Sequence, residues 1–224
     1  MTRIQFKPSI VLAAFVLAGC ASAADSTVEG LLAHMRDSYK GVKSATYTTE
    51  VTLTSKADGE QKFTSDFAYM KPNMMRIIIK GTGISEGAVT VISNGEKINV
   101  STLQGSMPPV DFSVENIEKG IPANLESLCF WDWDRQLSTS SGKNMEKSTF
   151  RIVKDEEWNG KHWEVLEETA TKDNVLCRYF IDPKTYFIWR TLVLSLEDKK
   201  PQMDAKLTKL NPSAGLDEAM FKGS

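Results

Sequence analysis

Hydrophobic residues near the start of the chain recur with the spacing of one face of an α-helix. They lie three or four residues apart, as an amphipathic helix requires, at Val28, Leu31, Leu32, Met35 and Tyr39. Ser26, followed three residues later by Glu29, has the pattern of a capping box, and Gly41 is a common helix terminator. We therefore predict an amphipathic helix over residues 27–40, with His34 on its solvent side.

Most of the remaining sequence alternates between apolar and polar residues with a period of two, which is typical of half-buried β-strands. Asn94-Gly95, Asn159-Gly160 and Asp182-Pro183 have the composition of tight turns between such strands. Strands are predicted at about residues 46–53, 62–69, 74–80, 88–93, 97–103, 148–155, 161–169, 174–181, 186–196 and 202–210. About ten strands with mostly short connections predict an up-and-down antiparallel sheet that is large enough to curl.

The middle of the chain breaks this alternation. Residues 114–137 are predicted to form one or two short helices, interrupted near Gly120 and Pro122, and they carry Trp131 and Trp133. The predicted fold class is therefore mainly β (α+β), with an N-terminal helix and a short helical lid. No internal repeat, low-complexity stretch or Pro/Gly-rich linker divides the sequence, so we expect a single domain.

The first residues have the pattern of an export signal. Arg3 and Lys7 precede a nine-residue apolar run at residues 10–18, which is shorter than the roughly 20 residues needed to span a bilayer. The letters LAGC at residues 17–20 resemble the bacterial lipobox, in which the cysteine becomes the diacylated first residue of the mature chain. We therefore predict a signal peptide at residues 1–19, a mature domain at residues 20–224, and a lipid anchor on Cys20.

Two destinations follow from this signal. Ala21 follows the cysteine, and the lipobox resemblance then implies an outer-membrane lipoprotein that faces the periplasm. The alternative is cleavage after the A-x-A sequence at residues 21–23, which would give a soluble periplasmic protein.

Charge and cysteine content narrow the possible partners. The 224 residues carry 27 basic and 29 acidic side chains, a net charge of −2, and no basic cluster, so no nucleic-acid partner is predicted. Besides Cys20, the chain has Cys129 and Cys177, which an oxidising compartment would allow to form a disulfide. Two buried free thiols are the alternative, because a sequence does not report the geometry of a disulfide.

The sequence contains none of the common catalytic motifs. It lacks a G-x-S-x-G elbow, a P-loop, a dinucleotide fingerprint and an H-E-x-x-H zinc motif. Only two histidines are present, His34 and His162, which leaves little material for a zinc site or a histidine-based triad. We therefore expect no metal, no cofactor and no enzymatic activity.

The predicted strands and lid are rich in aromatic and apolar residues. We predict a cavity on the concave side of the sheet, covered by the helical lid, that holds an apolar ligand. Its candidate lining residues are Phe63, Phe67, Tyr69, Met75, Ile77, Trp131, Trp133 and Trp189. The alternative is that these side chains only fill a core.

The order of elements resembles the outer-membrane lipoprotein carrier and receptor superfamily, LolA/LolB-like. The segments that carry the resemblance are FAYMKPNMMRI at residues 67–77, VISNGEKI at 91–98, FIDPKT at 180–185, and LTKLN with LDEAMF near the C-terminus. The likeness covers most of the mature chain. It implies an incomplete antiparallel β-barrel with a helical lid, whose cavity binds lipoprotein acyl chains.

The resemblance also implies roles for particular residues and partners. The soluble carrier of this superfamily holds its lid with an arginine before the proline, and this chain has Lys71 there, which makes Lys71 the candidate lid latch. Lysine lacks the planar fork of arginine. The implied function is non-enzymatic binding of a lipid or acylated lipoprotein by a monomer, in lipoprotein sorting or localisation at the outer membrane. A lipid-sensing or signalling lipoprotein with the same half-barrel, or a structural lipoprotein without a cavity, are the alternatives.

Overall fold

The computed structural model describes residues 27–55, 59–81, 89–113, 148–171 and 174–222. Residues 1–26 and 114–147 lie outside these ranges. The predictions that concern the signal peptide, Cys20, Cys129, Trp131 and Trp133 therefore lie outside the described residues.

The predicted helix is present as α1 (Val28–Gly41). Its apolar stripe buries Leu31, Met35 and Tyr39, as the spacing predicts. The N-cap lies one residue later than the capping-box pattern indicates, because the Thr27 side chain accepts a hydrogen bond from the Gly30 amide at 3.1 Å. Threonine is also a favoured N-cap residue, and here it satisfies one of the first amides of the helix, which have no partner within the helix.

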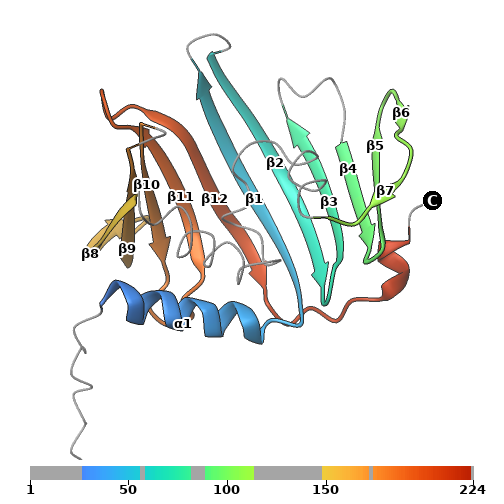
Figure 1. The fold of residues 1–224 in the computed structure, drawn as a ribbon, viewed down its shortest axis with the longest axis horizontal. Coiled ribbons are helices and arrows are strands. Elements are labelled where there is room, and N and C mark those ends of the chain that lie inside the picture. The colour runs from blue at the N-terminus through green and yellow to red at the C-terminus, as the bar shows by residue number, and fades with distance from the viewer. Residues whose placement is uncertain (1–26, 56–58, 82–88, 114–147, 172–173, 223–224) are drawn as a thin grey trace, which may run out of the picture.

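The described strands form one antiparallel sheet that does not close (Figure 1). In sequence order they are β1 (Ser44–Ser55), β2 (Gly59–Met70), β3 (Met74–Gly81), β4 (Val89–Asn94), β5 (Lys97–Thr102), β6 (Gly105–Ser106), β7 (Val110–Asp111), β8 (Ser148–Trp158), β9 (Lys161–Ala170), β10 (Val175–Ile181), β11 (Ile188–Ser195) and β12 (Pro201–Asn211). Ten of these are long and agree with the predicted strands, whereas β6 and β7 have only two residues each.

Two meanders build the sheet, and the first and last long strands join them. The spatial order is β6-β5-β4-β3-β2-β1-β12-β11-β10-β9-β8, with β7 paired to β5. The β1–β12 pairing includes Val51 opposite Ala205 and Leu53 opposite Met203. One edge of the sheet is therefore formed by β5, β6 and β7, and the other edge by β8 (Figure 1). Along the chain, residues 114–147 connect these two edges.

The three turn predictions are confirmed. Asn94 accepts hydrogen bonds from the amides of Glu96 and Lys97 at 3.0 and 2.9 Å, and Gly95 has a φ of 96°. Asn159 and Gly160 both have positive φ, which suits the tight turn between β8 and β9. The Asp182 carboxylate accepts from the amides of Lys184 and Thr185.

The C-terminal segment packs back onto the sheet. It ends in a short 3-10 helix, η4 (Glu218–Phe221), which is capped by Asp217 and contacts β3 and β4. Phe221 is fully buried. The fold class predicted from the sequence, a mainly β chain with one open, curled antiparallel sheet and an N-terminal helix, is confirmed.

Candidate functional site

One face of the sheet is apolar across six neighbouring strands. We call it the inner face and define it by Tyr47, Phe67 and Ile77, which belong to the same core cluster as the buried residues of α1. The register places one apolar side chain per strand in a continuous row: Leu210, Tyr47, Phe67, Ile77, Val91 and Val100, from β12 through β5. Every second residue of the ranges 45–51, 63–69 and 75–79, beginning with the first, lies on this face. None of these residues carries a charged side chain.

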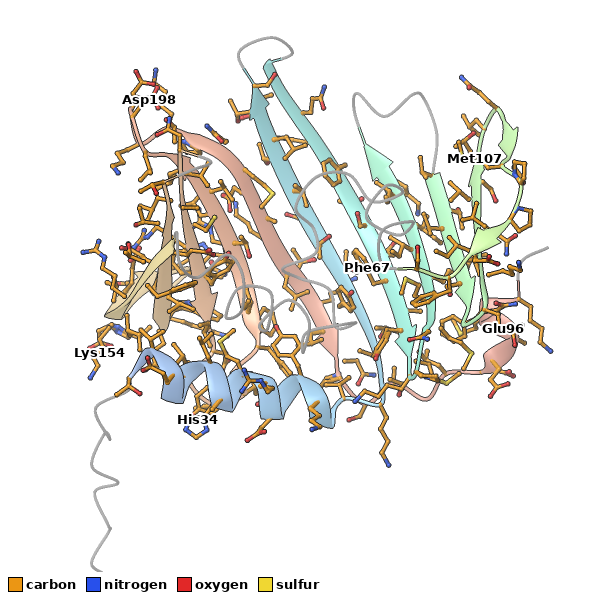
Figure 2. All side chains as sticks on the ribbon, in the orientation of Figure 1. His34, Phe67, Glu96, Met107, Lys154 and Asp198 are labelled. Atoms are coloured by element: carbon orange, nitrogen blue, oxygen red, sulfur yellow. The ribbon has the colours of Figure 1, made fainter. Side chains whose placement is uncertain are left out.

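The candidate residues of β2 and β3 all belong to this face. They are buried and lie opposite one another or opposite inner-face residues of β1, and they are Phe63, Phe67, Tyr69, Met75 and Ile77. Phe67 lies near the middle of the sheet (Figure 2) and stacks on Tyr47, with ring centroids 4.4 Å apart and an interplanar angle of 7°. The alternation therefore brings these five predicted residues onto one surface.

Two hydroxyl groups interrupt the apolar inner face. Thr49 and Ser65 lie directly opposite each other on β1 and β2, and each has 0% of its surface exposed. Neither hydroxyl has a hydrogen-bond partner within the described ranges. A buried hydroxyl without a partner destabilises a protein by roughly 1–3 kcal/mol.

Helix α1 closes one end of the inner face. The Tyr39 hydroxyl oxygen accepts a hydrogen bond from the amide of Ile188 at 3.0 Å, and its ring meets Phe187 edge-on at 5.0 Å. On the opposite side of the helix, the exposed His34 stacks on Tyr186 with centroids 4.8 Å apart. The solvent-side position predicted for His34 is confirmed, and α1 is fixed to the start of β11.

Lys71, the candidate lid latch, contacts α1. It follows β2 directly, and its ammonium group donates a hydrogen bond to the backbone carbonyl of Lys40 at 2.5 Å. Its backbone amide donates to the carbonyl of Lys43 at 2.9 Å. A cation at the C-terminal end of a helix is favoured by the helix dipole. The predicted lid lies outside the described residues, so the latch itself stays a prediction.

A second polar pair lies on the inner face of the other half of the sheet. The Tyr179 hydroxyl on β10 donates to the Glu168 carboxylate on β9 at 2.9 Å. Burial raises the pKa of the Tyr179 phenol well above its ordinary value, and Cys177 and the Glu168 carboxylate raise it further. Cys177 is half-buried on β10, and its predicted pairing with Cys129 stays a prediction because Cys129 is not among the described residues.

The opposite face of β8–β12 carries a second apolar cluster that the sequence did not reveal. Its core is Trp163, Val165 and Phe180. The guanidinium of Arg190 lies over the Phe180 ring at 5.1 Å and pairs with Asp204 at 2.8 Å. The strands β10 and β11 carry apolar side chains on both faces, so alternation alone did not indicate which residues would gather.

Trp189 differs from the other candidate lining residues in its position. It follows Ile188 at a register shift, where Phe180 pairs with Arg190 and Ile181 pairs with Ile188. Its ring lies 6.3 Å from that of Trp163, and it packs against the core clusters of both faces. Nε1 of Trp189 is buried without a hydrogen-bond partner in the described part of the chain.

The outer face of the sheet carries a groove of a different character. Its volume is about 440 Å³, and it lies beside the C-terminal segment. Its lining includes charged, polar and apolar residues such as Asp66, Arg76, Ile78, Lys209 and Met220, together with atoms of Tyr47, Phe67 and Leu210 from the same strands. Ile77 and Ile78 are neighbours on β3 that lie on opposite faces, which makes them a matched pair for testing the two surfaces.

Neither histidine belongs to a cluster of metal ligands among the described residues. His162 lies 3.4 Å from Asp155, and both side chains are largely exposed. Within the described ranges, no group of three or more His, Cys, Asp or Glu side chains is arranged to hold a metal ion. In the same part of the chain, no helix is both long and apolar enough to cross a bilayer.

Comparison with solved structures supports the fold. An uncharacterized conserved protein from Thermus thermophilus matches with a TM-score of 0.54 at 9% identity, covering 88% of this chain and 93% of that one. MucB matches with a TM-score of 0.50 at 14% identity, covering 88% of this chain and 62% of the MucB chain. This chain thus spans about three fifths of MucB.

A LolA superfamily protein from Nitrosomonas europaea also matches, with a TM-score of 0.42 at 9% identity, covering 88% of this chain and 98% of that one. No family profile and no curated protein matches the sequence. At these identities the likenesses concern the fold alone. The open antiparallel sheet with its N-terminal helix agrees with the half-barrel fold class predicted from the sequence.

Proposed function

We propose that the inner face of this half-barrel binds the acyl chains of a lipid or of an acylated lipoprotein, without enzymatic activity. One observation carries the proposal: the uncharged, apolar row that runs from Leu210 on β12 to Val100 on β5 across an open sheet. Each methylene buried against such a surface contributes about 0.8 kcal/mol before ordering costs. An acyl chain therefore needs no charged contact to bind there.

The predicted lid completes this proposal. Residues 114–147 join the strand pair at one edge of the sheet to β8 at the other edge. A segment with these end points is able to lie over the inner face, and it carries Trp131 and Trp133. We propose that these two tryptophans cover the bound chain, and that Lys71 keeps the helix end of the site in place.

The location is proposed from the N-terminal signal. A diacylated Cys20 would hold the domain at the periplasmic surface of the outer membrane and bring the inner face close to lipids. A role in lipoprotein sorting or localisation follows from binding at that place. The fold likeness to MucB supports a half-barrel and does not decide between sorting and sensing.

The neighbouring isoleucines of β3 give a direct test of which face binds. A fluorescent fatty acid is titrated into wild-type protein and into Ile77→Val and Ile78→Val. Loss of one methylene at Ile77 should weaken binding roughly fourfold, whereas the same change at Ile78 on the outer face should leave it unchanged. Trp133→Ala should weaken binding with the sheet still folded.

The rival account, in which the inner face is only a core, makes different predictions. Wild-type protein that has been stripped of lipid would then bind no acyl probe. Equal effects of Ile77→Val and Ile78→Val would also contradict the proposal. Native mass spectrometry of protein purified from membranes is an independent check, because the proposal predicts a co-purifying lipid.

A further inference from the structure

The hydroxyl pair on the inner face lies inside a row of otherwise apolar side chains. The register places Leu207, Thr49, Ser65, Ile79 and Val89 side by side on β12, β1, β2, β3 and β4. Thr49 and Ser65 are adjacent to each other and fully buried. The only other buried side-chain polar atom without a partner in the described ranges is Nε1 of Trp189, on β11.

The backbone is also irregular at this point. The pairing of β1 with β12 shifts register between Thr48 and Thr49, so that Thr48 pairs with Lys209 and Thr49 pairs with Leu207. Bulges of this kind often lie beside functional sites, where they redirect a side chain. Two hydroxyls without a partner among the described residues and a bulge therefore coincide in the centre of the proposed binding face.

The chemistry of the pair limits what it can bind. A serine or threonine hydroxyl donates one hydrogen bond and accepts up to two. The alternate positions of β1, β2 and β3 on this face carry no lysine or arginine. A carboxylate or phosphate buried here would have no counter-charge and would be strongly disfavoured, whereas a neutral carbonyl oxygen needs only a donor.

We propose that Thr49 and Ser65 donate hydrogen bonds to the carbonyl oxygen of an ester- or amide-linked acyl chain. This inference rests on the proposed function and narrows its substrate class. The preferred ligands are acyl glycerolipids or acylated proteins, and not hydrocarbons, alkyl ethers or free fatty acids that enter carboxylate first. Binding then satisfies two hydroxyls that have no partner in the described structure.

A pair of matched lipids tests this inference. A 1,2-diacylglycerol and the 1,2-dialkylglycerol of the same chain length differ only in their carbonyl groups. Each is used to displace a fluorescent fatty acid from the lipid-free mature protein. Wild-type protein should prefer the diacyl lipid by roughly five- to tenfold, the size expected for one or two hydrogen bonds.

Two variants connect that preference to the hydroxyls. Thr49→Val combined with Ser65→Ala should abolish the preference and leave the affinity for the dialkyl lipid equal or higher. Thr52→Val, on the same strand but on the outer face, should retain the preference. Circular dichroism and the melting temperature confirm that both variants are folded.

The outcomes distinguish a failure of the proposed hydroxyl site from a failure of the proposed acyl-chain binding. If wild-type protein binds both lipids equally, or the double variant keeps the preference, the hydroxyl site is wrong and acyl binding stands. If the wild-type protein binds neither the probe nor either lipid, the proposed function is wrong, and the hydroxyl site is wrong with it.

Discussion

The ammonium group of Lys71 donates a hydrogen bond to the backbone carbonyl of Lys40, 2.5 Å away, and so ties the turn after β2 to the last turn of α1. The two residues are 31 positions apart. The last carbonyls of a helix have no partner within the helix, and a cation beside them interacts favourably with the helix dipole. Lys71 therefore stabilises the end of the helix that closes the inner face.

Removing this contact should loosen the end of α1. Because Lys71 is exposed, Lys71→Met should lower the free energy of unfolding by no more than about 0.5–1 kcal/mol. Hydrogen exchange of amides in the last turn of α1 should accelerate, and exchange in β10 and β11 should not change. Lys43→Met, at an exposed lysine just after the helix, is the control; equal effects of the two changes would contradict the role of Lys71.

The buried hydroxyls predict an unusual stability effect. Thr49→Val keeps the shape of the side chain and removes a buried hydroxyl that has no partner in the described part of the chain, so it should raise the free energy of unfolding of the lipid-free protein by about 1 kcal/mol. Urea denaturation measures this change, with Thr52→Val on the outer face as the control. A loss of 1 kcal/mol or more in Thr49→Val would show that the hydroxyl has a stabilising partner.

The half-buried Tyr179, whose phenol donates to Glu168, predicts the response to alkaline pH. Its pKa in the folded protein is raised, so the unfolded chain loses this proton first as the pH increases. Its contribution to stability is fully present below about pH 10, the ordinary tyrosine pKa, and is lost as the pH rises toward the folded-state pKa.

Tyr179→Phe should therefore make the alkaline decline in the free energy of unfolding less steep. Chemical denaturation at a series of pH values above neutrality measures the slope. Tyr186→Phe removes a half-buried phenol that stacks on His34 and serves as the control. If the free energy of unfolding of Tyr179→Phe declined with pH as steeply as that of the wild type, the prediction would be contradicted.

The parts of the fold that depend on local pattern were predictable from the sequence. Alternation along residues 46–53 and 62–69 identified the inner face of β1 and β2, and Asn94-Gly95 marked a hairpin. The helix cap was placed one residue early, because Ser26 and Thr27 are both competent caps and only the backbone decides between them.

Long-range relationships were not predictable in the same way. The contact between Lys71 and Lys40 and the pairing of β1 with β12 join residues far apart in the sequence. Trp189 was expected on the inner face, but the register shift beside Ile188 lets it pack against both clusters. In a strand that is apolar on both faces, the sequence pattern does not indicate which side chains lie on which face of the sheet.

The lipid anchor has its own test. If Cys20 is processed as the lipobox indicates, the intact mass of the exported protein should correspond to residues 20–224 with a diacylglyceryl group. Cys20→Ser should release the protein from the membrane fraction. A mature chain that begins at Ala24 with no lipid mass would contradict the anchor and favour the soluble periplasmic alternative.

The most direct test of the account is to locate a bound acyl chain on the protein. A photoactivatable acyl ester is cross-linked to the lipid-free mature protein, and the labelled residues are identified by peptide mass spectrometry. The account predicts labels on inner-face residues such as Phe67, Ile77 and Val91, which an excess of unlabelled lipid removes. Absence of labelling, or labels confined to the outer groove beside Arg76 and Met220, would contradict it.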